Sequence, residues 1–345
     1  MKKIAMIGLR GSGKTCFTTA MTMAMNSGIK LDDGSVFNLS FADLQQMAPL
    51  MNAYMGMTND RNWPASTDAK NSYDFNSSLS LRRVLSFTLL DYPGGWLTDP
   101  NHMSEMLQEF NECASIIVLV GADMLRQFIH GNMGLYPYFS MLQQFTQNVI
   151  SEFDKEGSVF PPTIIAITKS DEFANEGEIK QAYDFLKQRF AAIFAVGTNI
   201  VSGLTHIQLG NNLKNNEAKI EGDLILKPEF GNLSIPILFS LYASTFTNRE
   251  NVISGGKIAG LKLTEAKKTL LESQNQNIIK RLRDRISGRQ KRIEETVIDM
   301  SRTVEGAKEQ LSNLSKVIHS IEPTLINGTE LYYNGERINN GERIN

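Results

Sequence analysis

Short, continuous apolar runs recur along the first 245 residues, and segments with helical spacing of apolar residues separate them. Apolar runs without alternation are typical of strands that are buried on both faces. Such strands belong to parallel sheets that helices cover on both sides. The pattern therefore predicts an α/β fold with a mostly parallel sheet. The strands expected in this sheet are Ile4 to Ile7, Ala114 to Val120, Thr163 to Ile167 and Ile235 to Phe239.

The segments between these runs are expected to form helices and one pair of neighbouring extended strands. A first helix starts near Thr15 and reaches about Ser27, and the paired extended segments are Ser72 to Ser80 and Arg83 to Leu90. The stretch 196–232 is rich in Asn and Gly and is interpreted as an insertion, which gives a first domain over 1–248. Further helices are expected over Met103 to Phe110, over Met124 to Phe153 with a break near Gly131 to Pro137, and over Glu178 to Ala195.

The carboxyl-terminal third has a different pattern. Gly255, Gly256 and Gly260 punctuate the chain, and a long helical extension is expected over 261–322, where Pro323 should end it. Its apolar residues alternate steps of four and three, as in a coiled-coil seam. The seam can pair with a helix of another chain, which we favour, pack on the first domain, or form a helical hairpin. It consists of Ile293, Val297, Met300, Val304, Ala307, Leu311, Leu314, Ile318 and Ile321.

Two features near this extension carry weaker signals. Basic residues crowd 280–292, which can contact an anionic lipid surface or a nucleic acid, or can simply form a solvated helix face. The tail 323–345 contains Asn334 to Asn339 repeated as Asn340 to Asn345, and it can form a hairpin at a sheet edge or stay disordered. The basic residues are Lys280, Arg281, Arg283, Arg285, Arg289, Lys291 and Arg292.

Composition narrows the class of protein. The 345 residues carry a formal net charge of −2, so no global field draws the chain to nucleic acid or to a membrane. The two cysteines, Cys16 and Cys113, stand far apart without metal-ligating neighbours, which argues against a disulfide framework or a zinc site. The longest apolar run is too short to span a bilayer, so we expect no transmembrane segment and a cytoplasmic location.

The residues from Gly8 to Thr15 fit the phosphate-loop (Walker A) pattern at every constrained position. In this motif the glycines let backbone N–H groups point at a phosphate chain, and the following helix adds its positive end. Lys14 is expected to reach the β- and γ-phosphates, and the Thr15 hydroxyl to ligate Mg²⁺. The alternative is a glycine-rich turn without a ligand. An apolar strand before the motif and a helical segment after it favour a nucleotide site.

Two later motifs also follow predicted strands. Asp91 ends an apolar strand and Gly94 comes three residues later, which suits a carboxylate that holds Mg²⁺ through water and a backbone N–H that meets the γ-phosphate. A plain strand-to-turn exit is the alternative. Because ligands lie at the carboxyl ends of parallel strands, these motifs are expected to meet at one edge of the sheet.

The stretch from Thr168 to Asp171 is the candidate for reading the base. The Asp171 carboxylate can accept two hydrogen bonds from guanine, whereas adenine presents an acceptor there, and Lys169 would lie along the ring. The alternative is a surface turn that caps a helix. Backbone N–H groups at Ser240 and Leu241, after the expected last strand, are weaker candidates for contacting the base oxygen.

Together, these motifs resemble the G1, G3, G4 and G5 boxes of TRAFAC-class GTPases with a Ras-like domain. More narrowly, Asp91 to Leu97 resembles a signature of the YcjX-type and double-GTPase proteins of bacteria. The resemblance covers about the first 245 residues. It implies hydrolysis of GTP to GDP, a nucleotide-dependent switch in a stress or defence system, and Thr67 or its rival Ser66 as a further Mg²⁺ ligand. The cofactor residues are Gly8, Arg10, Gly11, Ser12, Gly13, Lys14, Thr15, Cys16, Asp91, Gly94, Thr168, Lys169, Asp171, Ser240 and Leu241.

The chain departs from the family pattern at two positions. Thr168 stands where Asn is commoner, and Gly95 stands where Ras-like enzymes have a water-orienting glutamine. Hydrolysis would therefore need another group, and Arg10 joins Lys14 and Thr67 as a catalytic candidate. Two rival functions remain open, a nucleotide-bound scaffold that does not hydrolyse GTP and an ATPase. Cys16 either packs beneath the loop or has a pKa lowered by the helix N-terminus.

Overall fold

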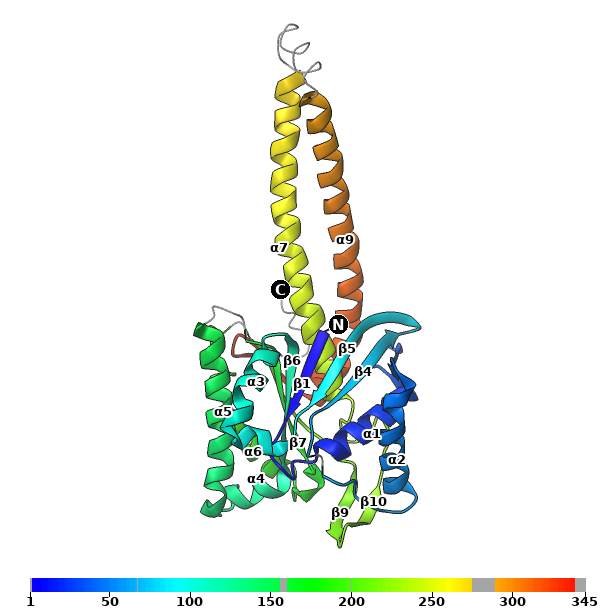
Figure 1. Cartoon of the computed structure of the whole chain (residues 1–345), viewed down its shortest axis with the longest axis vertical. Coiled ribbons are helices and arrows are strands. Elements are labelled where there is room, and N and C mark those ends of the chain that lie inside the picture. The colour runs from blue at the N-terminus through cyan, green and yellow to red at the C-terminus, as the bar shows by residue number, and fades with distance from the viewer. Residues whose placement is uncertain (1, 67, 156–159, 199, 275–288, 339–345) are drawn as a thin grey trace. The chain divides into compact units, whose positions relative to one another are not determined.

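The central feature of the computed structural model is one large mixed sheet. The structure describes residues 2–66, 68–155, 160–198, 200–274 and 289–338. Within these residues, ten strands pair in the order β12-β11-β8-β7-β6-β1-β5-β4-β3-β2, and β9 and β10 form a separate hairpin (Figure 1). Strands β8, β7, β6, β1 and β5 are parallel, which confirms the predicted α/β fold with a largely parallel sheet.

The strands on the amino-terminal side are β1 (Lys2–Ile7), β2 (Ile29–Lys30), β3 (Val36–Phe41), β4 (Asn71–Leu79), β5 (Arg82–Asp91) and β6 (Cys113–Gly121). The remaining strands are β7 (Thr163–Thr168), β8 (Val201–His206), β9 (Gly210–Asn216), β10 (Lys219–Leu224), β11 (Glu330–Tyr333) and β12 (Glu336–Ile338). The expected pair of extended segments is the antiparallel pair β4 and β5.

The helices are α1 (Lys14–Asn26), α2 (Met47–Thr58), α3 (Pro100–Phe110), α4 (Ala122–Ile129), α5 (Tyr136–Lys155), α6 (Glu176–Arg189), α7 (Ile235–Gln274) and α9 (Arg289–Gly328). The break expected near Gly131 to Pro137 separates α4 from α5. Short 3-10 helices include η2 (Gly94–Thr98) and η4 (Ser170–Glu172).

Helices cover both faces of the sheet because its central strands are apolar on both sides. On one face, residues of α3, α4, α5 and α6 form a continuous core with alternate residues of the strands, such as Val118 and Ile165. On the other face, the α1 residue Thr18 contacts Met6, and Phe239 in the first turns of α7 lies against Gly203 of β8. Burial of this many apolar side chains, each contributing roughly 1.5–3 kcal/mol, fixes the register of the sheet.

The prediction that Ile235 to Phe239 is the last strand is wrong. These residues begin α7, and the strand that extends the parallel sheet is β8 (Val201–His206), inside the stretch interpreted as an insertion. A short apolar run has no periodicity that separates a buried strand from a buried helix. Here Ile237, Leu238 and Phe239 are all fully buried, so the helix is apolar on every side at this point.

The described part of the tail forms a hairpin at the edge of the sheet, which was one of the two open alternatives. Strand β11 pairs antiparallel with β8 and with β12. Asn334 and Gly335 make the turn with φ of 53° and 78°, which suits a two-residue hairpin turn. The second copy of the repeat, from Asn340, lies outside the described residues.

The chain separates into two compact units. One contains residues 1–244 and 320–345, and the other contains residues 245–319. Helix α7 continues through Gly255, Gly256 and Gly260, so the helical extension begins before the predicted residue 261. Likewise, α9 continues through Pro323 to Gly328. Pro323 is exposed, while its neighbours Ile321 and Leu325 are fully buried, and their burial offsets the missing backbone hydrogen bond.

Within the second unit, the predicted seam packs against the same chain. Gly256 of α7 lies against Ala307 of α9, where an added Cβ would be 3.7 Å from the Ala307 methyl group, and Figure 1 shows the two helices side by side. The described seam residues of this unit are at least partly buried. This arrangement is the helical-hairpin alternative, and a partner helix from another chain stays a prediction. Large apolar residues also remain exposed on this unit, at Ile258, Leu261, Leu271 and Ile298.

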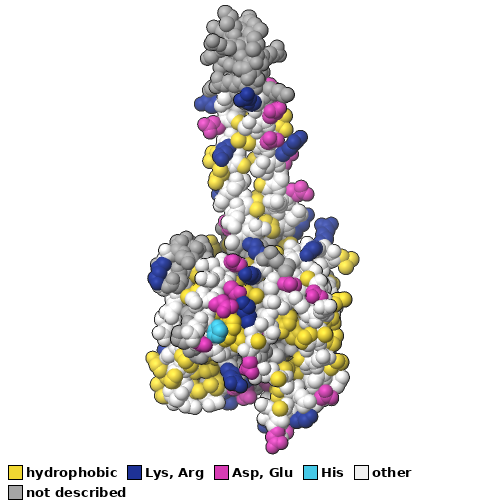
Figure 2. Space-filling model, viewed as in Figure 1, with side chains coloured by type: hydrophobic (Ala, Val, Ile, Leu, Met, Phe, Trp, Pro, Cys, Tyr) yellow, Lys and Arg dark blue, Asp and Glu magenta, His cyan; other side chains and the backbone are white. Residues whose placement is uncertain are grey.

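The surface carries charges of both signs. On the face seen in Figure 2, Lys and Arg side chains are interspersed with Asp and Glu, in keeping with the formal net charge of −2. Most of the basic stretch 280–292 lies outside the described residues, so its expected contact with an anionic surface stays a prediction. None of the described helices combines the length and apolar character needed to cross a membrane.

Replacing Leu204 tests the assignment of β8 as a core strand. Leu204 is fully buried on this strand, so Leu204→Ala should lower the free energy of unfolding by about 2–5 kcal/mol. Chemical denaturation followed by circular dichroism measures this change. Leu44, which is 75% exposed, provides the control, because Leu44→Ala should change stability by no more than about 0.5 kcal/mol. A similarly small loss for Leu204→Ala would mean that β8 is a surface insertion.

Candidate functional site

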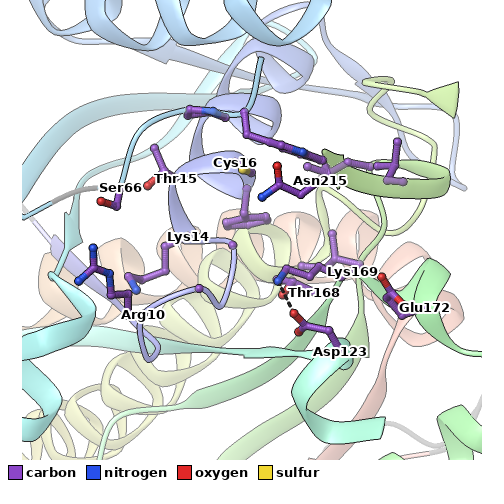
Figure 3. A pocket seen from close by; sticks show the side chains of 18 of the residues that line it. Arg10, Lys14, Thr15, Cys16, Ser66, Asp123, Thr168, Lys169, Glu172 and Asn215 are labelled. Atoms are coloured by element: carbon purple, nitrogen blue, oxygen red, sulfur yellow. Dashed lines mark hydrogen bonds and ion pairs between the residues drawn. The ribbon is translucent and has the colours of Figure 1, made fainter. Parts of the chain in front are cut away.

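A cavity of about 400 Å³ lies where the parallel strands end. Its floor is the loop between β1 and α1, and one end is formed by the residues after β7. The segment before β4 and the β9–β10 hairpin supply further walls, and Figure 3 shows the polar side chains that point into it. Loops from strands far apart in the sequence meet here because parallel strands place all their carboxyl ends at one edge of a sheet.

The loop from Gly8 to Thr15 has the curled backbone that its sequence predicts. Gly11 and Gly13 have φ of 83° and 82°, a region in which L side chains are strained. Helix α1 begins immediately afterwards, and Phe17 N–H donates to the Gly13 carbonyl at 2.9 Å. The positive end of the α1 dipole therefore faces the cavity, which favours an anion at this position.

Lys14 lies at the centre of this loop. Its ammonium donates to the Gly8 carbonyl at 2.6 Å and to the Leu9 carbonyl at 3.3 Å. Burial lowers the pKa of Lys14, and the nearby Asp91 carboxylate partly opposes that shift. A buried ammonium gains the most from an anionic ligand, so the loop favours a group with several negative oxygens.

Asp91 lies beneath the loop rather than on the cavity wall. It ends β5 opposite Met6 of β1 and is almost fully buried, and its Oδ1 atom has no hydrogen-bond partner within the described structure. Burial raises the pKa of Asp91 to about 6, although Lys14 acts in the opposite direction. A buried carboxylate oxygen without a partner is costly unless it meets a cation or a water molecule.

These features fit a magnesium ion that binds together with a phosphate group. Asp91 and the Thr15 hydroxyl are oxygen donors of the kind that Mg²⁺ prefers. Among the described residues, no three His, Cys, Asp or Glu side chains gather to form a complete metal site. Phosphate oxygens and water would therefore have to supply the other ligands.

The segment after β5 approaches the loop closely at Gly94. A Cβ atom at Gly94 would lie 2.4 Å from the Arg10 backbone nitrogen and 2.8 Å from the Leu9 carbonyl carbon. Only glycine fits such a contact between two backbones. Gly95 is exposed and has no side chain that could orient a water molecule. Arg10 is also exposed and lies on the cavity wall, so its guanidinium is a candidate for adding positive charge.

The residues after β7 are tied to the phosphate-binding loop. The Thr168 hydroxyl donates to the Ser12 carbonyl at 2.7 Å, so the threonine found in place of asparagine connects the two loops. Lys169 has a left-handed backbone with φ of 56°, and its ammonium pairs with Asp123 at 2.6 Å (Figure 3). This ion pair holds the lysine side chain along one wall of the cavity.

Asp171 is half-buried at the same end of the cavity. Its Oδ2 atom accepts the Leu213 N–H of β9 at 2.9 Å. Burial raises the pKa of Asp171, while the Leu213 hydrogen bond lowers it. A carboxylate has about four lone-pair sites, so Asp171 can accept further hydrogen bonds from a ligand.

Cys16 lines the cavity, but its thiol is not activated. Burial raises the pKa of Cys16 to about 11, and the Lys169 charge reduces this shift only in part. The alternative of a pKa lowered by the helix N-terminus is therefore wrong. Burial is the largest cause of this shift, which favours a packing role for the thiol.

The cavity brings together most of the predicted cofactor residues. Gly8, Ser12 and Asp91 are buried and are not among the residues that line the cavity. The predicted contacts from Ser240 and Leu241 are wrong, because both residues are buried inside α7 and the Ser240 hydroxyl donates to the Pro236 carbonyl. Thr67 lies outside the described residues, while its rival Ser66 lines the cavity. The predicted residues on the wall are Arg10, Gly11, Gly13, Lys14, Thr15, Cys16, Gly94, Thr168, Lys169 and Asp171.

Other wall residues escaped the sequence prediction. Asp123 could have been predicted, because it is an acidic residue just after the buried strand β6, where ligand-binding residues are expected. The wall residues that come from the stretch 196–232 could not be predicted, because β8 is not recognisable as a strand of the parallel sheet from its sequence. The additional residues are Phe17, Trp63, Pro64, Ala65, Asp123, Glu172, Ile207, Leu209, Leu213, Lys214 and Asn215.

No protein-family model and no curated protein matches the sequence. Among solved structures, the chain is similar to one in the signal recognition particle receptor SRb-GTP/SRX complex from Chaetomium thermophilum. The identity is 15%, the match covers 60% of this chain and 90% of that chain, and the TM-score is 0.35.

A second similar structure is an ADP-ribosylation factor-like GTP-binding protein, also named small COPII coat GTPase SAR1, from Encephalitozoon cuniculi in complex with GDP. The identity is 12%, the match covers 72% of this chain and 82% of that chain, and the TM-score is 0.30. At these values the likeness assigns neither a family nor an activity.

Asp91 should make stability depend on pH in the absence of nucleotide and metal. Its folded pKa of about 6 exceeds the unfolded value, so the folded state retains a proton that the unfolded state releases. Stability should therefore fall by about 2 kcal/mol as the pH rises from 4 to 7. Asp91→Asn should remove this component when unfolding is measured with a chelator present. The control is Asp184→Asn, at an exposed position on α6. If Asp91→Asn and the unmodified protein showed the same dependence of stability on pH, the raised pKa of Asp91 would be contradicted.

Proposed function

We propose that the protein binds GTP with Mg²⁺, hydrolyses it slowly to GDP and phosphate, and acts as a nucleotide-dependent switch. The observation that carries this proposal is that one cavity contains a positively charged loop and, at another part of its wall, a carboxylate. The glycine-rich loop with Lys14 forms one part of the cavity, and the Asp171 carboxylate lies at the end formed by the residues after β7. A nucleotide has complementary groups in the same order, a phosphate chain at one end and a base with N–H donors at the other.

At the phosphate end, the chain's own groups can neutralise a triphosphate. Backbone N–H groups at the start of α1 point toward the anion, and Lys14 can exchange its two backbone carbonyl partners for phosphate oxygens. Mg²⁺, when bound, would bridge the phosphates and offset their charge. Thr15 and Asp91 are the residues that would hold it, directly or through water.

At the base end, Asp171 favours guanine. The guanine N1–H and amino group can both donate to the carboxylate, whereas adenine would direct an acceptor at it. Leaving a half-buried carboxylate without its partner can discriminate between two ligands by about 10⁴. Leu209 and Leu213 supply apolar surface beside it for a planar ring.

The switch part of the proposal rests on two segments that border the phosphate end. Gly94 packs on the backbone of the phosphate-binding loop, and Ser66 belongs to the segment on the Thr15 side of the cavity (Figure 3). A γ-phosphate can hold both segments, and its loss removes that contact. Ligand-dependent movement then reaches residues outside the cavity.

A second candidate function is a scaffold that retains GTP without hydrolysing it. The exposed Gly95 favours this alternative, because it provides no group that positions the attacking water. An ATPase is a third candidate, which competition between GTP and ATP for the same site would distinguish.

The base preference is tested by Asp171→Asn. Asparagine keeps an oxygen that can accept the Leu213 N–H, but it presents an amide donor to the base. The preference should therefore move from guanine toward xanthine, which has an oxygen in place of the guanine amino group. Competition binding should show GTP weakened by about 10²-fold or more and xanthosine triphosphate strengthened. Lys14→Ala should weaken both nucleotides equally. Preference for ATP in the unmodified protein would contradict the guanine assignment.

The role of Arg10 in turnover is tested by Arg10→Ala. An arginine that meets the γ-phosphate in the transition state can accelerate hydrolysis by about 10³-fold, so single-turnover hydrolysis should slow strongly. The affinity for GTP should change little, because Arg10 lies at the exposed rim of the cavity. Equal rates in the variant and the unmodified protein would remove Arg10 from the mechanism. A measurable rate in neither would instead support the scaffold.

A further inference from the structure

The β9–β10 hairpin touches both the base end of the cavity and the segment that leads to its phosphate end. It is a two-stranded hairpin whose turn residues, Glu217 and Ala218, have φ of 49° and 68°. Left-handed backbone at residues other than glycine and asparagine is strained and persists where surrounding contacts hold it. Two sets of contacts hold the hairpin in this conformation, one at β9 and one at the turn and β10.

The first contact joins the hairpin to the base-reading carboxylate. Leu213 N–H donates to Asp171 Oδ2 at 2.9 Å. A hydrogen bond to an ionised carboxylate is roughly twice as strong as one between neutral groups. The strength of this link therefore depends on Asp171 carrying its charge. Leu213, Lys214 and Asn215 also line the cavity directly, and Figure 3 shows Asn215 among the side chains that point into it.

The second contact joins the hairpin to the segment 60–63. Trp63 N–H donates to the Ala218 carbonyl at 2.9 Å, and Ile220 N–H donates to the Arg61 carbonyl at 2.6 Å. Asn62 and Lys219 form a β-bridge between these two hydrogen bonds. The segment thus adds to the outer edge of β10 as a short third strand.

Two side chains strengthen this edge. The Lys219 ammonium donates to the Asp60 carbonyl at 3.2 Å, and the Arg61 guanidinium donates to the Gly222 carbonyl. Gly222 has φ of 93°, and a Cβ there would lie 2.3 Å from the Asn212 carbonyl oxygen. Glycine therefore permits the bend of β10 that turns its carbonyl toward Arg61.

The segment held in this way continues directly into the cavity wall. Trp63, Pro64, Ala65 and Ser66 all line it. The Trp63 indole nitrogen is buried without a partner in the described structure. Ser66, at the far end of this short run, belongs to the part of the wall near Thr15 (Figure 3). Any displacement of β10 would therefore be passed to residues beside the phosphate site.

We propose that the β9–β10 hairpin couples recognition of the base to the position of the segment 60–66, so that a matched base stabilises the wall of the phosphate site. This inference rests on the proposed function, because it takes the ligand to be a guanine nucleotide. The coupling runs from Asp171 through Leu213 and the hairpin to Arg61 and Trp63. It makes the hairpin a positioning element for the segment that meets the γ-phosphate.

The physical basis is the orientation of the Asp171 carboxylate. Two hydrogen bonds from guanine fix the plane of this carboxylate and keep its Oδ2 atom aligned with the Leu213 N–H. A base that donates only one hydrogen bond leaves the carboxylate freer to rotate away from Leu213. The difference in binding free energy between the two bases sets the largest change that the hairpin can cause in the conformational equilibrium of the segment 60–66.

Hydrogen exchange with GDP and inosine diphosphate tests the coupling. The two ligands have identical phosphates, but hypoxanthine lacks the amino group, so it donates only once to Asp171. At saturating concentrations with Mg²⁺, the Trp63 amide should exchange at least about fivefold more slowly with GDP than with inosine diphosphate. The double variant Arg61→Ala, Lys219→Ala removes both side-chain links from the edge of β10, and it should reduce this difference at least about threefold.

The matched control is Asn216→Ala. Asn216 donates to Glu221 within the hairpin at 2.7 Å and takes no part in the hydrogen bonds to segment 60–63, so its variant should keep the full difference. Equal Trp63 exchange with the two ligands in the unmodified protein would overturn the coupling, as would an undiminished difference in the double variant. Failure of both ligands to bind would overturn the proposed function and this inference together, whereas binding without a response at Trp63 would overturn this inference alone.

Discussion

The site depends on the burial of two opposite charges beneath one loop. Lys14 and Asp91 are both removed from water, and burial shifts the pKa of each toward the neutral form. The parallel pairing of β1 with β5 brings them together, and the curl of the glycine-rich loop supplies carbonyl partners for the ammonium. A protein accepts such groups only where a ligand or a fixed network offsets the cost. The glycine-rich loop therefore holds the Lys14 ammonium in place, while the Asp91 Oδ1 atom lacks a hydrogen-bond partner within the described residues.

The end of the cavity after β7 combines the sheet with the β9–β10 hairpin, because Ile207 N–H donates to Ile167 of β7 and Asp171 contacts β9. Thr168, at the end of β7, is joined to the glycine-rich loop by a buried hydrogen bond to the Ser12 carbonyl. Asp171 reaches in the other direction and holds the β9–β10 hairpin. The residues from Thr168 to Asp171 thus contact both the floor and a side wall of the cavity.

Local patterns predicted most of the parallel sheet and the floor of the site. The glycine spacing before Lys14, the acidic end of β5 and the sequence from Thr168 to Asp171 each encode their geometry within a few residues. The prediction failed where a run of residues was compatible with two structures. Ile235 to Phe239 suits a buried strand or a buried helix equally, and only packing against β8 selects the helix. Pro323 likewise stays inside α9 because burial of Ile321 and Leu325 outweighs its local preference.

The sequence by itself determined the curled loop, the apolar strands β1, β6 and β7 and the chemical groups that a nucleotide would require, because these depend on residues that are neighbours in the chain. Only the tertiary structure decided that β8 completes the parallel sheet, that the tail adds two strands beside it, and that the seam of α9 packs on α7 of the same chain. It also decided that the β9–β10 hairpin meets Asp171 and Trp63. These contacts join residues far apart in sequence, and no local periodicity records which distant surface will bury a given segment.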